Sequence, residues 1–228
     1  MEDRFRKAAR PAPCDPFADA ASVAGYAERP PRQVPGFADL HRMAALLLAE
    51  HAPPDGRVLI VGAGGGLELK ALAELQPAWR MTGVDPSAVM LDLARKTLGE
   101  GPRAVDLVHG TVEELPLEPF DGATCILVMH FLDEDTRRET LAGVHARLRP
   151  GARLVLVHHS FDRGEASTWL ARYAAYAGVP YPHGMLALPV LSPDEDEALL
   201  RAAGFEDVDL FYAGFSFRGW VAVRPQTP

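Results

Sequence analysis

Short apolar runs alternate with segments of helical periodicity through most of the chain. In the helical segments apolar residues recur at steps of three and four, and in the runs between them they follow one another almost without a break. The predicted strands cover residues 58–61, 80–84, 105–109, 123–129 and 153–158, and the helices between them cover 67–75, 87–98 and 136–148. This alternation predicts an α/β fold in which helices cover both faces of a largely parallel sheet.

The N-terminal part follows another pattern. The sequence predicts a short helix over residues 18–27 and a connector rich in Pro and Gly over 29–36. A helix follows, with an apolar face running from Phe37 to Leu48. We therefore expect an N-terminal helical cap over residues 1–52 and one main domain over residues 53–228.

The C-terminal part completes the main domain. A helix is predicted over residues 164–177, and Ser192 with Glu195 has the spacing of a capping box at the start of a helix that Gly204 ends. Two further runs, 208–212 and 216–223, predict a hairpin that adds an antiparallel strand to the sheet. Thr136 and Glu139 have capping-box spacing at the start of the preceding predicted helix, 136–148.

A glycine-rich loop, Gly62 to Gly66, lies between the first predicted strand and its helix, and Asp85 closes the second strand. Glycines allow a sharp turn and the close approach of a ligand, and a carboxylate at this distance can accept hydrogen bonds from both ribose hydroxyls of an adenosine. In the nicotinamide fingerprint the third glycine would replace Leu67, whereas here it comes one residue earlier, at Gly66. The early third glycine resembles the loop of S-adenosylmethionine-binding enzymes, and a nicotinamide dehydrogenase is the rival class of enzyme.

Charge and cysteine usage narrow the choice of partners. The chain has 23 Lys and Arg residues against 31 Asp and Glu, a formal net charge of −8. Such a surface repels phosphate backbones, so we expect no nucleic-acid partner. The cysteines, Cys14 and Cys125, lack metal-ligand spacing, and no apolar stretch is long enough to span a bilayer. We expect a cytoplasmic protein with no metal site and no membrane association.

Four further segments resemble the class I S-adenosylmethionine-dependent methyltransferase family, in the family's order. They are His109–Pro116, Phe120–Leu132, Leu148–Val157 and Ala203–Phe205. The resemblance implies a Rossmann-like seven-stranded sheet in the order 3-2-1-4-5-7-6, with strand seven antiparallel, and S-adenosylmethionine as the cofactor. It also implies a set of cofactor-binding residues: Gly62, Ala63, Gly64 and Gly66 beside the methionine part, Asp85 on the ribose, Pro86, Thr111 and Val112 around the adenine, and Val128 beside the methyl group.

This sequence departs from the family pattern at two positions. Ile60 stands where the family often has an acidic residue just before the first glycine, and Thr111 replaces an aspartate that usually meets the adenine amino group. Glu68, at the start of the next helix, either takes over the contact with the methionine ammonium or is a solvated helix residue. These departures keep open a non-catalytic module that only binds the cofactor.

A narrower resemblance is to the carboxy-S-adenosylmethionine synthase branch of the family. It is carried by Arg32–Phe37, the pair Phe131–Leu132 and Val157–Asp162. That branch has an asparagine where Ile126 stands, and an arginine for the added carboxylate on a longer insertion, where this chain offers only His183. Methyl transfer is therefore preferred, and carboxyl transfer is kept as the alternative.

Candidate substrate-handling residues cluster near the ends of the fourth and fifth predicted strands. His130 is the candidate base. Of the neighbours His158 and His159 at most one faces the ligand, because adjacent strand residues point to opposite faces, and His158 is the expected wall residue. The other expected wall residues are Tyr26, Tyr181 and His183, for all of which plain packing is the competing interpretation. We expect a methyltransferase that acts on a small molecule beneath a short cap, with a homodimer as a possible assembly.

Overall fold

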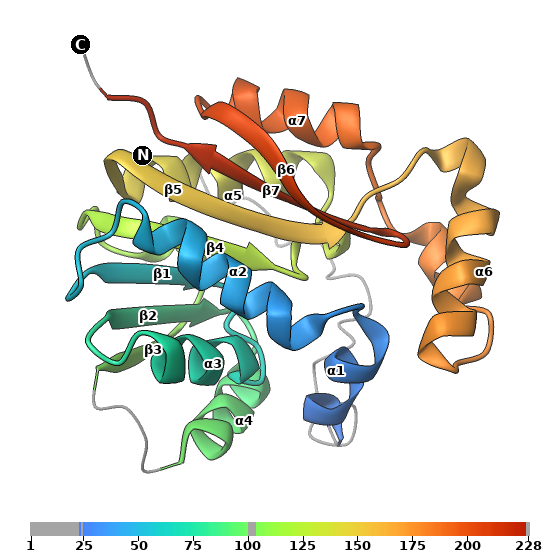
Figure 1. Ribbon diagram of the computed structural model, residues 1–228, viewed down its shortest axis with the longest axis horizontal. Coiled ribbons are helices and arrows are strands. Elements are labelled where there is room, and N and C mark those ends of the chain that lie inside the picture. The colour runs from blue at the N-terminus through green and yellow to red at the C-terminus, as the bar shows by residue number, and fades with distance from the viewer. Residues whose placement is uncertain (1–22, 24, 100–103, 227–228) are drawn as a thin grey trace, which may run out of the picture.

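A computed structural model describes residues 23, 25–99 and 104–226, and these residues form one mixed sheet with helices on both faces (Figure 1). The seven strands have the order β3-β2-β1-β4-β5-β7-β6. β7 is antiparallel to both β5 and β6, and the other neighbours are parallel. The predicted fold class and strand order are confirmed. The strands are β1 (Arg57–Val61), β2 (Arg80–Asp85), β3 (Val105–His109), β4 (Phe120–Ile126), β5 (Leu148–His159), β6 (Glu206–Gly214) and β7 (Phe217–Val223).

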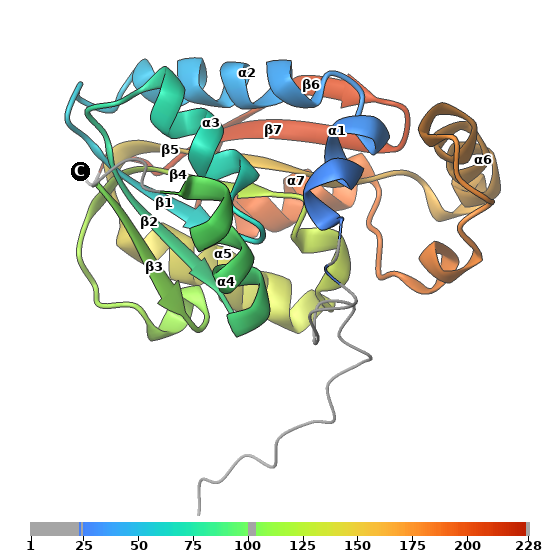
Figure 2. The same ribbon diagram turned by 90° about the horizontal axis from the view of Figure 1, so that it is seen from below.

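The helices divide between the two faces of the sheet and its carboxyl edge. The α-helices are α1 (Arg29–Gln33), α2 (Phe37–Ala49), α3 (Leu67–Leu75), α4 (Ala88–Leu98), α5 (Glu134–Arg147), α6 (Ala166–Ala177) and α7 (Pro193–Ala202). The apolar cluster on one face includes side chains of α2, α3 and α4, and the cluster on the other includes side chains of α5 and α7 (Figure 2). α1 and α6 lie beyond the carboxyl ends of the parallel strands (Figure 1).

The helix α2 has the amphipathic character that its sequence predicts. Leu40, Ala44 and Leu48 are fully buried and share one apolar cluster with residues of β1 and β5. In contrast, the segment 29–36, expected to be a connector, contains the short helix α1. Pro30 and Pro31 lie in its first turn, where a missing N–H costs no hydrogen bond. The helix expected over 18–27 falls mostly outside the described residues, and Tyr26–Glu28 form a 3-10 turn, η1.

The end of β4 differs from the prediction in a way that shapes the site. The strand ends at Ile126, and Leu127 then takes a left-handed conformation with φ 63°. The next residues, Met129–Phe131, form a 3-10 turn, η3. An unbroken apolar run gives no sign of this reversal, because periodicity does not report φ. The chain therefore turns three residues before the predicted end of the strand.

The observed N-terminal caps of α7 and α5 can be compared with the capping boxes that the sequence predicts. The capping box at α7 is confirmed, because Ser192 Oγ accepts from the Glu195 N–H and the Glu195 carboxylate accepts from the Ser192 N–H. At α5 the capping residue is Asp133, whose Oδ1 accepts from the Thr136 N–H at 2.9 Å, so the box predicted from Thr136 and Glu139 is wrong. None of the helices in the described ranges is long and apolar enough to cross a membrane.

Candidate functional site

The glycine loop between β1 and α3 is packed too closely for side chains. Gly62 has φ 71°, and a Cβ there would overlap Cγ2 of Val128, which lies directly against it. Gly66 has φ 80°, and a Cβ there would lie 2.8 Å from the backbone Cα of Ala94 in α4. Both positions therefore require glycine, and the loop offers bare backbone at the carboxyl edge of the sheet.

Asp85 is held beside this loop at the end of β2. Its Oδ2 accepts the Gly64 N–H at 2.8 Å, and its Oδ1 accepts the Ser87 N–H at 2.8 Å. These two bonds fix the carboxylate plane, and each oxygen of a carboxylate can accept further hydrogen bonds. An oriented carboxylate next to a glycine loop is suited to a vicinal diol such as that of ribose.

Glu68 is buried in the first turn of α3, on the other side of the loop. It is 8% exposed, and its Oε1 has no hydrogen-bond partner among the described residues. It lines a cavity of about 40 Å³ together with Gly62, Gly64 and Tyr26. Burial raises the pKa of Glu68 to about 7, and the nearby Thr124 hydroxyl opposes the rise. The interpretation of Glu68 as a solvated helix residue is therefore wrong.

A larger cavity of about 260 Å³ adjoins this site beyond the carboxyl ends of β4 and β5. Tyr26, Pro30 and Leu127 line both cavities, so the two spaces share a wall. The other lining residues are mostly apolar or aromatic and come from α1 and the residue after it, η3, the end of β5, α6, β7 and the segment before α7. They are Arg29, Gln33, Val34, His130, Phe131, His159, Tyr173, Met185, Leu188 and Phe217.

Two neutral imidazoles provide polar groups in this wall. The His130 and His159 rings meet edge to face with centroids 4.8 Å apart. His159 Nδ1 lies 2.9 Å from Ser216 Oγ, whereas no described residue is a hydrogen-bond partner of His130 Nδ1. Burial lowers the pKa of His130 well below its ordinary value and that of His159 to about 3. Each ring is therefore neutral at neutral pH and has one donor and one acceptor nitrogen.

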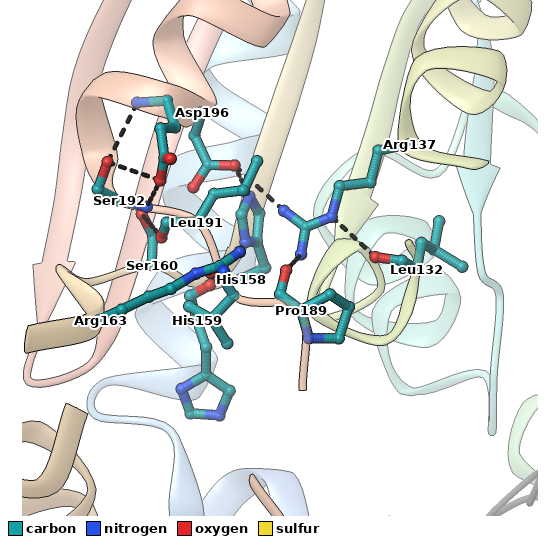
Figure 3. Close-up of polar contacts among 12 residues, drawn as sticks. Leu132, Arg137, His158, His159, Ser160, Arg163, Pro189, Leu191, Ser192 and Asp196 are labelled. Carbon is teal, nitrogen blue, oxygen red and sulfur yellow. Dashed lines mark hydrogen bonds and ion pairs between the residues drawn. The ribbon is translucent and has the colours of Figure 1, made fainter. Parts of the chain in front are cut away.

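Of the two adjacent histidines that end β5, the structure directs His159 to the cavity and His158 away from it. His158 is fully buried on the opposite face, where its Nε2 lies 3.5 Å from Asp196 Oδ1 (Figure 3). Its ring also packs against Trp220. Strand alternation correctly predicted that at most one would face the ligand, but the expected wall residue was His158, and this is corrected to His159.

Two other expected wall residues do not line the cavity. Tyr181 packs against a separate apolar cluster around Phe161, and His183 is exposed with its Nδ1 3.1 Å from the Tyr181 carbonyl oxygen. The same segment reaches the cavity through Met185 and Leu188 instead. The expectation favoured polar residues in this segment, but its apolar residues face the cavity.

A buried arginine fixes the segment that carries these two side chains. Arg137 of α5 is 1% exposed, and its Nη1 lies 3.4 Å from Asp196 Oδ1 of α7 (Figure 3). Its guanidinium also donates to the carbonyl oxygens of Leu132 and Pro189. Arg137 therefore ties the cavity wall to the helical layer beneath it.

The residues expected around the adenine lie at the neighbouring strand ends. Pro86 is exposed after β2, and its carbonyl oxygen is 2.9 Å from His109 Nε2. The Thr111 hydroxyl caps the turn η2 (Val112–Glu114) by accepting the Glu114 N–H. The Val112 side chain is buried in the core, 2% exposed, so at this position only the backbone is left to border a base. The adenine contacts stay a prediction.

Sequence reasoning missed several cavity residues. Leu127 lies in both cavity walls with a backbone conformation that a branched residue adopts only when its surroundings enforce it. Arg29 and Gln33 were assigned to a connector, and Tyr173 lies in the predicted helix over residues 164–177 without being singled out. A Leu in an apolar run has no sequence signal for positive φ, but the proline pair at a helix start could have indicated α1.

Comparison with known proteins places this geometry in a family. A family model described as a methyltransferase domain matches residues 58–151. Together with the sheet order, the glycine loop and Asp85, this match supports the class I S-adenosylmethionine-dependent methyltransferase family, whose cofactor is S-adenosylmethionine. No described group of three or more His, Cys, Asp or Glu side chains is arranged to hold a metal ion.

Within that class the chain is similar to carboxy-S-adenosyl-L-methionine synthases. It is 29% identical over 222 residues to the enzyme of Chromohalobacter salexigens, covering 90% of this chain and 82% of that one. It is 25% identical over 216 residues to the enzyme of Klebsiella pneumoniae, covering 85% of each. These relatives agree with the branch that the sequence motifs resemble.

Solved structures of methyltransferases share the fold. An O-methyltransferase family protein from Burkholderia thailandensis has a TM-score of 0.73 at 15% identity, covering 94% of this chain and 65% of that one. A putative O-methyltransferase from Nostoc punctiforme has a TM-score of 0.68 at 20% identity, covering 89% and 59%. This chain therefore spans less than two thirds of the length of both solved chains, and at these identities the similarity shows the fold alone.

The residues present fit the family's cofactor. The glycine loop has room for a ligand backbone but not for side chains at Gly62 and Gly66, and Asp85 is oriented beside it. Glu68 supplies a buried carboxylate oxygen without a described partner at the same loop. The loop, the oriented carboxylate of Asp85 and the buried acid are thus compatible with the amino-acid and ribose parts of S-adenosylmethionine.

Proposed function

We propose that this protein is an S-adenosylmethionine-dependent methyltransferase whose acceptor is a small molecule. The observation that carries the proposal is the 260 Å³ cavity that shares Tyr26, Pro30 and Leu127 with the cavity of the glycine loop. A space of this size lies at the lower end of ligand pockets and accommodates a compact molecule. The shared wall brings an acceptor in the larger cavity next to the cofactor.

The lining favours a compact aromatic or apolar acceptor with one hydrogen-bonding group. Phe131, Tyr173 and Phe217 supply flat surfaces, and Met185 and Leu188 add flexible apolar contacts. The neutral rings of His130 and His159 desolvate at little cost and can accept an O–H or N–H from the acceptor. This combination supports an aromatic hydroxyl or amine as the methylated group.

The residues of the cavity perform the transfer by positioning and proton acceptance. When bound, S-adenosylmethionine supplies an electrophilic methyl group. Val128, packed against Gly62, and Leu127, which lines both cavities, limit the approach to one direction, and the apolar wall excludes water. Transfer to an acceptor oxygen or nitrogen would break the methyl–sulfur bond of the bound cofactor and leave its electrons on sulfur. His130 Nδ1 takes the proton that the acceptor loses. This proton becomes strongly acidic during the transfer, so a base of low pKa such as His130 can accept it.

Carboxyl transfer is the second candidate, and one observation favours it. Arg29 lines the larger cavity, and a cation in this wall is what the binding of an added carboxylate requires. The relatives named carboxy-S-adenosyl-L-methionine synthase support the same alternative.

Mass spectrometry of the ligand that co-purifies with the protein, followed by a transfer assay with methyl-labelled cofactor, tests the proposal. We expect S-adenosylmethionine or its demethylated product, and label transfer to members of a library of small phenols and amines. Replacing His130 with Ala should slow transfer by about 10²-fold or more while preserving cofactor binding. A carboxylated cofactor would support the second candidate instead. Transfer only to tRNA or protein would overturn the small-molecule acceptor, and no transfer would favour a non-catalytic module.

A further inference from the structure

The acid that the family often places before its first glycine is missing from β1 of this chain. Ile60 occupies that position and is fully buried in an apolar cluster with residues of α2 and α3. The ammonium of the methionine part carries a full positive charge, and burying it without an anionic partner is unfavourable by several kcal/mol. A carboxylate from another element would remove this cost.

Glu68 lies where such a carboxylate is needed. It belongs to the first turn of the nine-residue helix α3, directly after the glycine loop, and it lines the same small cavity as Gly62, Ala63 and Gly64. The side chain is 92% buried, since 8% is exposed, and its Oε1 has no partner among the residues that the structure describes. The cavity volume of about 40 Å³ is enough for a group the size of an ammonium.

The surroundings of Glu68 contain no described cation that would otherwise neutralise it. The other residues of this cavity are apolar or aromatic, apart from the imidazole of His41, whose pKa is lowered by burial to about 4 and which is therefore neutral. Burial in the same surroundings raises the pKa of Glu68 to about 7. A buried acid in this state gains most from a ligand that brings its own positive charge.

We propose that Glu68 binds the α-ammonium of S-adenosylmethionine and of its demethylated product, and so replaces from α3 the acid that β1 lacks. The contact is a charge-assisted hydrogen bond in a site shielded from water. It selects ligands that have the amino group of methionine, and contributes nothing to ligands that have only the adenosine part. The inference rests on the cofactor of the family and is independent of the acceptor proposed above.

Isothermal titration calorimetry with two ligands isolates the contact. The ligands are S-adenosylhomocysteine and its deamino analogue, 5′-(3-carboxypropylthio)-5′-deoxyadenosine, which differs only in lacking the amino group. At about pH 8, where the carboxyl is mostly ionised, we expect the wild-type protein to prefer S-adenosylhomocysteine by about 10- to 100-fold. Glu68→Gln should remove this preference by weakening S-adenosylhomocysteine alone.

The control variant is Glu74→Gln, which neutralises an exposed carboxylate on the same helix and should keep the full preference. Equal affinity of the wild-type protein for the two ligands would overturn the proposal, and so would an unchanged preference in Glu68→Gln. Equal weakening of both ligands would assign Glu68 a structural role instead.

A measurement on the wild-type protein keeps the proposal testable if the variant fails to fold. Near pH 7 the binding of S-adenosylhomocysteine should release a fraction of a proton, seen as a heat that varies with buffer ionisation enthalpy, and the deamino analogue should release none. Proton release by both ligands alike, or by neither, would count against Glu68. Because these experiments need no acceptor, they are unaffected if the proposed methyl acceptor is wrong.

Discussion

At the scale of single residues, the site depends on ionisable groups whose charged forms are disfavoured by burial. His130 and His159 are uncharged because burial lowers their pKa values, and Glu68 is close to half-protonated near neutral pH because burial raises its pKa. Each of these groups is costly to charge in its buried surroundings. A ligand that supplies the opposite charge or accepts a hydrogen bond therefore gains affinity from removing that cost.

The pKa of Glu68 predicts a pH dependence of stability. The folded protein binds its proton more tightly than the unfolded chain, since its pKa is about 7 against an ordinary 4.5. The unfolding free energy must then fall as the pH rises through this window. We expect wild type to lose about 3 kcal/mol relative to Glu68→Gln between about pH 4 and pH 8 in urea titrations.

The neighbours of Glu68 do not interfere with this measurement. In the folded protein burial raises the pKa values of Tyr26 and Cys125 and lowers that of His41 to about 4, so none of the three changes charge there through most of the window. Their titration in the unfolded chain is common to wild type and Glu68→Gln, and therefore cancels in the comparison. Glu74→Gln, which changes an exposed residue, is expected to follow the wild-type pH profile. A Glu68→Gln profile parallel to wild type would contradict the raised pKa.

Residues of the site differed in how well the sequence predicted them. Glycines and a strand-terminal carboxylate have backbone reasons for their positions, so Gly62 and Asp85 could be located from the sequence alone. Tyr181 and His183 could not be judged, because side-chain direction in an irregular segment depends on packing against distant elements. Which of His158 and His159 faces the cavity depends on how β5 pairs with β4 and β7, and a single sequence does not give that pairing.

At the scale of elements, the helix starts show where local rules are sufficient. The Ser192 cap of α7 was predicted because proline, serine and glutamate occur together there. At α5 the cap is Asp133, three residues before Thr136, and its carboxylate accepts the Thr136 N–H. Sequence spacing alone does not rank two overlapping caps, since both satisfy the same rule.

The two possible caps of α5 give opposite mutational predictions. Asp133→Ala removes the acceptor of the Thr136 N–H and should lower the unfolding free energy by about 1 kcal/mol. Glu139→Ala changes an exposed residue that takes no part in the observed cap, and should cost less than about 0.5 kcal/mol. Chemical denaturation of both variants measures the two losses of unfolding free energy. A larger loss for Glu139→Ala than for Asp133→Ala would favour the capping box of Thr136 and Glu139 instead.

The Arg137–Asp196 ion pair links α5, α7 and the cavity wall. Replacing Arg137 with Met leaves Asp196 buried without its guanidinium partner, which should cost about 3 kcal/mol of unfolding free energy. Because the Pro189 carbonyl also loses its donor, hydrogen exchange of residues 183–191 should accelerate. Arg138→Met, which breaks an exposed ion pair with Glu134, should change neither quantity by much. Unchanged exchange in Arg137→Met would show that the wall is held by other contacts.

At the scale of the whole molecule, the fold was the most predictable property. Alternating strands and helices leave few sheet arrangements, and the family resemblance selected the observed order of seven strands. The larger cavity was not predictable, because it is assembled from α1, α6 and the ends of β4, β5 and β7, which are far apart in sequence. A single sequence predicts elements better than the spaces between them.

Ligand-induced stabilisation distinguishes the cofactor classes for the intact protein. S-adenosylhomocysteine at about 100 times its dissociation constant should raise the unfolding free energy by about 2.7 kcal/mol, a thermal shift of about 5–10 °C. NAD at the same concentration should give no shift, because the loop lacks the glycine spacing that a diphosphate requires. Asp85→Ala is expected to reduce the response to S-adenosylhomocysteine. A shift with NAD alone would favour the dehydrogenase class.

The wall common to both cavities has a thermodynamic consequence. Tyr26, Pro30 and Leu127 contact whatever fills either space, so any rearrangement that one ligand imposes on them alters the affinity for the other. Such coupling is reciprocal: if the cofactor strengthens acceptor binding by some factor, the acceptor must strengthen cofactor binding by the same factor. A demethylated cofactor in the smaller cavity would contact the same three residues and follow the same reciprocity, so it and a methylated product in the larger cavity would each influence how tightly the other is retained after a turnover.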